Sequence, residues 1–263
     1  MRAISQKKRL LTAAVGLPVL IAAVAVGGWP LWIVLAAAAL VGMEEFFTMV
    51  GHPGPVFRLV AFGLGLAAVA GAAVGGLGWL VVPPLCALWI EQFDFLRRFG
   101  FLGDKTLPRG VLVEAVLYIP TTLAVLACLA PLETFFILAV VMATDTGAYY
   151  GGFSIGGPKI WPSVSPAKTV SGSLCGLAAG VLVGSAFGLF TARSAGVLAG
   201  LAAVMSVVSQ GGDFFESALK RAVGVKDSGR VLPGHGGVLD RIDGLLPAVL
   251  VYAACRTWWG LVG

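Results

Sequence analysis

The chain has 263 residues, of which 58% are hydrophobic and only 12% are charged, and its mean hydropathy is +0.95. A soluble protein of this length needs roughly a quarter charged residues. The composition therefore excludes a soluble globular protein, and it equally excludes disorder, coiled coil and collagen. It indicates an all-α, polytopic integral membrane protein, in which the net charge of +5 reflects cytoplasmic loops and not a nucleic-acid partner.

Apolar stretches long enough to cross a bilayer recur along the whole chain. We count about nine, with eight as the alternative, because the glycine-broken region from 58 to 90 is the least regular. They cover residues 10–27, 29–43, 58–75, 77–90, 111–130, 132–150, 170–190, 194–212 and 244–260.

The distribution of cations sets the orientation of these spans. With the N-terminus in the cytoplasm, all but two of the 18 Lys and Arg residues, Arg193 and Arg256, fall in cytoplasmic segments. Because cations near span ends are retained on that side, this arrangement places the N-terminus and the polar loops in the cytoplasm. The expected location is the cell (inner) membrane.

The four cysteines, Cys86, Cys128, Cys175 and Cys255, are scattered without a Cys-x-x-Cys pair. Neither a disulfide framework nor a zinc site is expected, and we interpret them as small packing residues.

The first 140 residues contain seven acidic side chains and no close constellation apart from Glu44 and Glu45. We interpret these as solvated charges at the membrane surface. The chain is therefore treated as one membrane domain, with N-terminal transmembrane helices over 1–140 and a catalytic transmembrane region over 141–263.

Two features mark the beginning of the second region. Asp145 lies within an apolar stretch, where an ionisable side chain is a functional candidate by default, with capping or pairing to a lysine as the structural alternative. The span 170–190 has a glycine at every fourth position, which lets another helix approach closely. Helix packing, within the chain or in a homodimer, is favoured over a substrate groove.

The densest polar pattern begins at Asp213. Asp213, Glu216, Ser217, Lys220 and Arg221 are spaced so that they form one stripe on a helix. From 213 to 243, ten of 31 residues are charged. An ordinary solvated loop would explain that density, but not carboxylates at two adjacent helix ends.

The helix is expected to end at Gly224, and a glycine- and cation-rich loop follows over 226–237. Backbone amides in such a loop can approach phosphate oxygens. Asp240 and Asp243 then lie on one face at the start of the final span. Carboxylates gathered with cations suit Mg²⁺ and phosphate groups, and nucleotidyl transfer needs mainly such positioning, without a protein nucleophile.

The residues from 217 to 243 resemble the signature of the phosphatidate cytidylyltransferase (CDP-diglyceride synthetase) family. The matching pattern is Ser217, Lys220-Arg221, Lys226-Asp227, Gly229, Leu232-Pro233, His235-Gly236-Gly237, Asp240-Arg241 and Asp243. The segments 145–149, 165–172 and 212–213 are similar to further motifs of the family in the same order. The resemblance is strong over 140–244, whereas the N-terminal half is only compatible with it.

The resemblance implies a helical membrane enzyme that transfers CMP from CTP to phosphatidic acid in the lipid bilayer, with Mg²⁺, giving CDP-diacylglycerol and pyrophosphate. On this basis Asp213 and Asp240 are the first candidate metal ligands, followed by Asp243 and Asp145. The candidate catalytic residues are Asp213, Ser217, Lys220, Arg221, Asp240 and Asp243, and the candidate substrate-binding residues are Lys168, Thr169, Lys226, His235 and Arg241.

Three other interpretations remain at this stage. A secondary transporter would show paired features in two halves, whereas the polar motifs all lie in the last 120 residues. A scaffold protein would need no ordered metal and phosphate residues. Within the enzyme class, the rival is a relative that acts on another lipid phosphate or a polyprenol.

Overall fold

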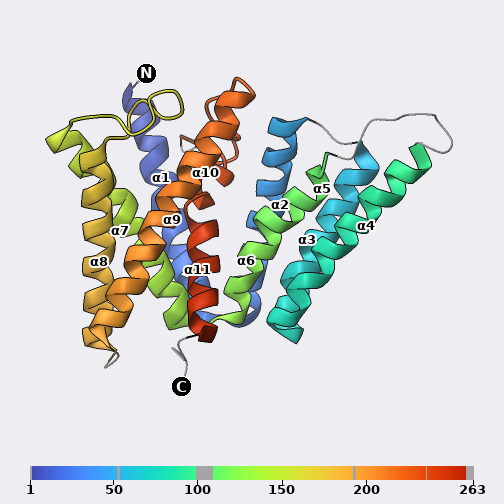
Figure 1. Cartoon of the computed structure of the whole chain (residues 1–263), viewed down its shortest axis with the longest axis horizontal. Helices are drawn as coiled ribbons and strands as arrows, with labels where there is room; N and C mark the ends of the chain where they lie inside the picture. The colour runs from blue at the N-terminus through green and yellow to red at the C-terminus, as the bar shows by residue number, and fades with distance from the viewer. Residues whose placement is uncertain (1, 52–53, 99–108, 192–193, 235, 259–263) are drawn as a thin grey trace. The chain divides into compact units, whose positions relative to one another are not determined.

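The computed structural model (Figure 1) describes residues 2–51, 54–98, 109–191, 194–234 and 236–258, with the side chains of 2–13 and 257–258 outside that description. Over these residues the chain is helical. It contains no strand there, only isolated bridges between Lys159 and Thr169 and between Leu232 and Gly236. The prediction of an all-α fold is confirmed.

The helices pack as two units. The first unit comprises residues 1–129 and 228–239, and the second comprises residues 130–227 and 240–263. The first contains α1 (Arg2–Val26), α2 (Gly28–Val50), α3 (Pro55–Gly75), η1 (Leu77–Val81), α4 (Val82–Arg97), α5 (Val111–Val116), η3 (Leu117–Thr121), α6 (Thr122–Val125) and η4 (Leu126–Cys128). The second contains α7 (Pro131–Ile155), α8 (Val170–Phe190), α9 (Ala195–Ala222) and α11 (Leu245–Trp258), while α10 (Leu239–Ile242) begins at the last residue of the first.

Seven helical segments among the described residues are long and apolar enough to cross a membrane. They are Gly28–Val50, Pro55–Gly75, Leu77–Arg97, Val111–Cys128, Pro131–Ile155, Val170–Phe190 and Ala195–Ala222. Two shorter apolar helices, Ala14–Val26 and Leu245–Arg256, coincide with the first and last predicted spans. The polytopic architecture is as predicted, and the count of nine spans stays a prediction.

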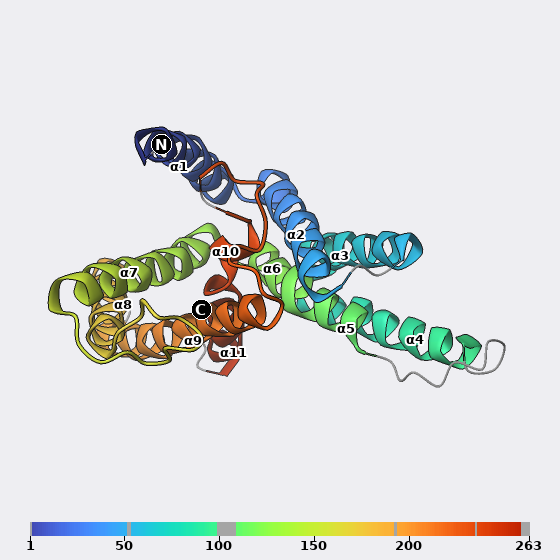
Figure 2. The same cartoon turned by 90° about the horizontal axis from the view of Figure 1, so that it is seen from above.

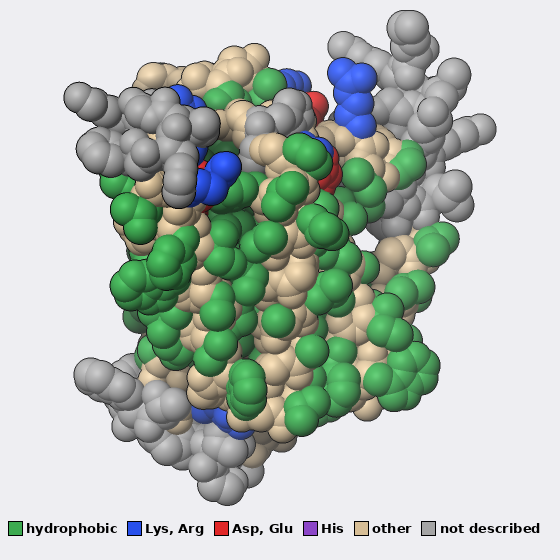
Figure 3. Space-filling view, turned by 90° about the vertical axis from the view of Figure 1, so that its right-hand side faces the viewer, with side chains coloured by type: hydrophobic (Ala, Val, Ile, Leu, Met, Phe, Trp, Pro, Cys, Tyr) green, Lys and Arg blue, Asp and Glu red, His purple; other side chains and the backbone are tan. Residues whose placement is uncertain are grey.

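The outer surface of these helices is hydrophobic. In Figure 3, hydrophobic side chains predominate in the middle of the face shown, whereas Lys and Arg side chains appear toward its top and bottom and Asp and Glu side chains toward its top. Large apolar side chains such as Val74 and Phe190 are 88% and 90% exposed. Exposed apolar area of this extent is unfavourable in water and favourable in lipid, in agreement with a membrane protein.

Glycines allow the helices of the second unit to pack closely. Figure 2 shows α7, α8 and α9 side by side, and the five glycines at every fourth position of α8 are all buried. A methyl group at Gly176 would lie 2.7 Å from the Thr144 carbonyl oxygen on α7, and one at Gly184 would lie 2.6 Å from the Leu198 carbonyl oxygen on α9. The predicted role in helix packing within the chain is confirmed.

The prediction that the early acidic residues are solvated is wrong for three of them. Glu45, Glu91 and Glu133 are only 4%, 8% and 8% exposed. Each carboxylate accepts a backbone N–H that would otherwise lack a partner; the Glu91 Oε1 atom, for example, lies 2.9 Å from the Leu112 nitrogen. Burial is tolerated because hydrogen bonds replace the water that each carboxylate loses. Glu44, in contrast, is a part-exposed partner of Arg58 at 3.0 Å.

Candidate active site

Helix α9 carries the predicted polar stripe at its C-terminal end. Ser194 caps the N-terminus, where its hydroxyl oxygen accepts the Val197 N–H at 3.4 Å. The helix ends at Ala222, and Gly224 follows with φ +74°, a left-handed conformation that suits glycine. Lys220 and Arg221 lie in the last turn, where cations interact favourably with the helix dipole.

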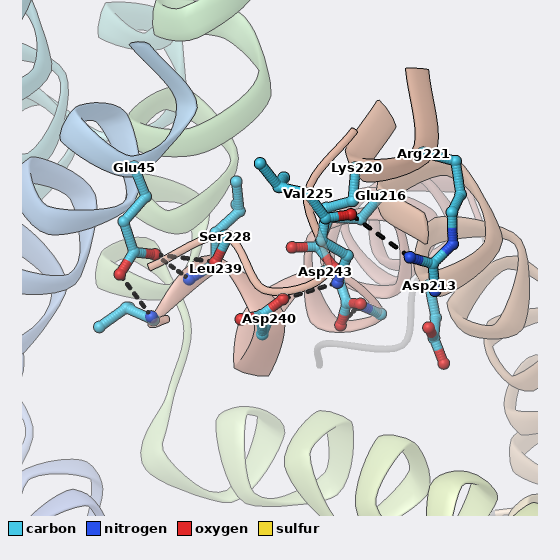
Figure 4. A network of polar contacts seen from close by, with 12 residues as sticks. Glu45, Asp213, Glu216, Lys220, Arg221, Val225, Ser228, Leu239, Asp240 and Asp243 are labelled. Carbon is cyan, nitrogen blue, oxygen red and sulfur yellow. Dashed lines mark hydrogen bonds and ion pairs between the residues drawn. The ribbon is translucent and has the colours of Figure 1, made fainter. Parts of the chain in front are cut away.

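Three charged side chains form a buried ion cluster between α9 and α10 (Figure 4). The Lys220 ammonium donates to Glu216 Oε2 at 2.7 Å and to Asp240 Oδ1 at 2.6 Å. The side chains of Lys220, Glu216 and Asp240 are only 12%, 0% and 8% exposed. One ammonium therefore hydrogen-bonds two carboxylates and offsets one of their two charges, which lowers the cost of burying them and links the start of α10 to α9.

Asp243 packs against α9 at Gly212, where the absence of a side chain leaves room for it. A side chain at Gly212 would overlap the Asp243 carbonyl oxygen and lie 2.8 Å from Pro247 Cγ. The Gly244 N–H donates to Asp243 Oδ1 at 2.7 Å. Burial, together with the negative charges of Asp213 and Glu216, raises the pKa of the Asp243 carboxyl well above its usual range. The site therefore concentrates negative charge that a cation would stabilise.

A second group surrounds Asp213. Its carboxylate forms an ion pair with Lys168, which lies in the loop between α7 and α8. The Lys168 ammonium also lies 4.3 Å from the centroid of the Phe214 ring, a cation–π contact. Asp145 lies within electrostatic range of Asp213, Lys168 and Arg241. The structure thus brings Asp145 and Asp213, two of the four predicted metal ligands, close to Lys168.

The remaining predicted residues have different surroundings. The Thr169 hydroxyl caps α8 by accepting the Gly172 N–H at 3.1 Å, and Arg221 donates to the Val225 carbonyl oxygen at 3.3 Å. Lys226 is exposed and Ser217 is half-buried. The prediction for His235 lies outside the described residues.

Glu216 was part of the predicted stripe, but sequence reasoning did not select it as a site residue. The structure places its buried side chain beside Asp243, with Oε2 accepting a hydrogen bond from Lys220 and Oε1 buried without a hydrogen-bond partner among the described residues. The sequence did offer one indication of this role. Glu216 lies four residues before Lys220, and a Glu in that position relative to a Lys forms a stabilising ion pair on a helix.

The fit to a metal ion rests on the chemistry of these donors. Asp145, Asp213, Glu216 and Asp243 supply the hard oxygen ligands that Mg²⁺ prefers, and their mutual repulsion would be relieved by a cation. Over the part of the chain that the structure describes, no three His, Cys, Asp or Glu side chains already converge in metal-binding geometry. The ligand set is therefore a proposal, developed below.

Comparison with known proteins agrees with this chemistry. The model of the cytidylyltransferase family matches residues 7–258. A phosphatidate cytidylyltransferase of Brucella suis biovar 1 (strain 1330) is 37% identical over 243 residues, which cover 82% of this chain and 88% of the relative. A phosphatidate cytidylyltransferase of Bacillus subtilis (strain 168) is 31% identical over 257 residues, which cover 92% of this chain and 94% of the relative. One of Staphylococcus aureus (strain COL) is 33% identical over 257 residues, which cover 91% of this chain and 95% of the relative. With nearly its whole length matched, the chain belongs to the cytidylyltransferase family.

Proposed function

We propose that this protein transfers CMP from CTP to phosphatidic acid, giving CDP-diacylglycerol and pyrophosphate for phospholipid biosynthesis. Its family and the names of its relatives support the reaction. The observation that carries the proposal is the cluster of Glu216, Lys220 and Asp240, with Asp243 beside it, inside a helical membrane protein. It combines buried carboxylates and a cation within the segment that resembles the family signature.

The reaction is a substitution at phosphorus. A phosphate oxygen of phosphatidic acid attacks the α-phosphorus of CTP in line, and a new P–O bond forms. The bond from the α-phosphorus to the oxygen that bridges to the β-phosphorus breaks, and its electron pair leaves with pyrophosphate. Two anionic substrates must be held together, so positioning and charge neutralisation provide most of the catalysis.

In this proposal the carboxylates bind the metal ion, and the Lys and Arg side chains bind the substrate phosphates. Asp213, Asp240, Asp243 and Asp145 would hold Mg²⁺, with Glu216 supporting them. Bound there, the ion would neutralise phosphate charge in the transition state. The cations that would hold substrate phosphates are Lys168, Lys220, Arg221 and Arg241. Lys226 and His235 would contact the triphosphate or the cytosine, Ser217 would orient a ligand or a phosphate, and Thr169 would contribute to substrate binding.

Two of these assignments require exchange of partners. Lys168 and Lys220 are paired with Asp213 and Asp240 in this structure. A lysine that moves from a carboxylate to an incoming phosphate would release that carboxylate for the metal. The ion pairs would thus offset part of the negative charge of the site before substrate binds.

We also propose that the N-terminus and the site face the cytoplasm of the cell (inner) membrane. The support is the distribution of Lys and Arg along the sequence and the need for access to the water-soluble nucleotide. Labelling of Lys226, which is exposed, with a membrane-impermeant amine reagent in intact cells and in inverted vesicles tests this orientation. Labelling only in inverted vesicles is expected, and labelling only in intact cells would contradict it.

The site assignment is tested with purified protein in phospholipid vesicles that contain phosphatidic acid. Asp213→Asn and Asp240→Asn should each lower Mg²⁺-dependent CDP-lipid formation by at least about 100-fold, since a lost charge-stabilising contact is worth several kcal/mol in the transition state. Asp94→Asn is the matched control, because Asp94 on α4 pairs with Arg97 and Arg98 at the end of that helix, outside the site. Full activity in both site variants would refute the assignment.

A further inference from the structure

Glu45 is a buried carboxylate near the C-terminal end of α2. It is 4% exposed, whereas the side chain of its neighbour Glu44 is 44% exposed and pairs with Arg58. Burying a carboxylate without partners is very unfavourable. Its partners therefore indicate why the carboxylate is there.

Those partners all come from one segment far along the chain, residues 228–239, in the same packing unit. Glu45 Oε2 accepts the Leu239 N–H at 2.8 Å and the Ser228 hydroxyl at 3.2 Å, and Glu45 Oε1 accepts the Val238 N–H at 3.0 Å (Figure 4). One carboxylate thus binds both the first residue of the segment and its last two.

Two glycines of the segment make this approach possible. A side chain at Gly229 would overlap Glu45 Oε1, and a side chain at Gly237 would lie 2.5 Å from Glu45 Oε2. Neither glycine has a left-handed φ, so the requirement is space for the carboxylate and not backbone conformation. We call the contacts of Glu45 with Ser228, Val238 and Leu239 the Glu45 clamp.

We propose that Glu45 is a positioning residue for nucleotidyl transfer, acting through the Glu45 clamp. The inference rests on the proposed function. The clamp closes the segment 228–239, which carries most of the glycine-rich part of the signature, and it binds the backbone amide immediately before Asp240. Glu45 thereby holds Leu239, the residue directly before Asp240, in place. Glu45 itself touches no reacting group.

The neutral variant Glu45→Gln should disrupt the clamp while keeping the size of the side chain. The amide nitrogen cannot accept a hydrogen bond, so it would face either the Val238 N–H or the Leu239 N–H and Ser228 hydroxyl. Hydrogen bonds to a charged group are strong enough that their loss corresponds to about a 10- to 100-fold change in an equilibrium. We expect amide exchange to accelerate by that factor at the N–H that loses its acceptor, Val238 or Leu239.

The experiment compares wild type, Glu45→Gln and the matched control Glu44→Gln, all as full-length protein in lipid nanodiscs. Hydrogen–deuterium exchange over residues 228–239 is measured without substrate, and kcat and KM for CTP are measured with phosphatidic acid. For Glu45→Gln we expect the faster exchange together with about a 10- to 100-fold lower kcat at similar thermal stability. Glu44→Gln should match wild type in exchange, kcat, KM and thermal stability.

If Glu45→Gln does not fold, Ser228→Ala provides a second test of the Glu45 clamp. It removes a single contact of the clamp and should give a smaller increase in exchange and a smaller fall in kcat. Unchanged exchange in both folded variants would overturn the clamp. Faster exchange with unchanged kcat would overturn the positioning role.

The experiment distinguishes failure of the proposed function from failure of the positioning role. Wild-type protein that forms no CDP-lipid would overturn the proposed function and with it the positioning role. The exchange measurement uses no substrate, so it would still show whether the Glu45 carboxylate holds residues 228–239.

Discussion

Replacing Lys220 with methionine should strongly destabilise the second unit. The Lys220 ammonium is the shared partner of Glu216 and Asp240 at 2.7 and 2.6 Å, and all three side chains are at most 12% exposed. Removing it leaves two carboxylates buried without their cation. Breaking a buried ion pair in this way costs about 3–5 kcal/mol of unfolding free energy.

The assay is denaturant unfolding in detergent micelles, followed by tryptophan fluorescence. Lys226→Met is the matched control, because Lys226 is exposed on the following loop and its replacement should change stability by less than about 0.5 kcal/mol. The double variant Lys220→Met/Asp240→Asn should be more stable than Lys220→Met alone, since one of the two uncompensated charges is gone. If Lys220→Met is as stable as the control, the ion cluster does not hold α9 and α10 together.

Three further predictions concern packing and capping. Gly184→Val should destabilise the protein by at least about 1–3 kcal/mol in the same unfolding assay, because its Cβ would lie 2.6 Å from the Leu198 carbonyl oxygen; Gly196→Ala, in open space, should not. Thr169→Ala removes the α8 cap and should cost about 1 kcal/mol, and Thr169→Ser should restore most of it; equal stability of both would argue against the cap. Glu133→Gln weakens contacts to Tyr252 at 2.9 Å and Arg256 at 2.8 Å and should speed proteolysis of the C-terminal helix; an unchanged cleavage rate would show that this contact does not anchor α11.

Local sequence pattern was sufficient for the parts of the molecule that depend on one helix. The stripe from Asp213 to Arg221, the end of its helix near Gly224 and the glycine face of α8 follow from helical periodicity and glycine chemistry. These features need only the spacing of residues along one element.

Pairings between distant segments could not be predicted in the same way. Lys220 and Asp240 were both candidate site residues, but sequence spacing does not show that they neutralise each other. Glu44 and Glu45 look equivalent in the sequence, and only the packing of α2 distinguishes the exposed from the buried one. The contact of Glu45 with Leu239 joins residues 194 positions apart, which no local pattern encodes.

The most direct test of the central claim follows the α-phosphorus of CTP. Purified protein in vesicles that contain phosphatidic acid would receive CTP labelled at the α- or at the γ-phosphorus, with Mg²⁺ present and then chelated. The account predicts that α-label enters the lipid, that γ-label appears only in pyrophosphate in equal amount, and that chelation stops both. A folded preparation that leaves the lipid unlabelled, or that labels it from the γ-position, would contradict CMP transfer.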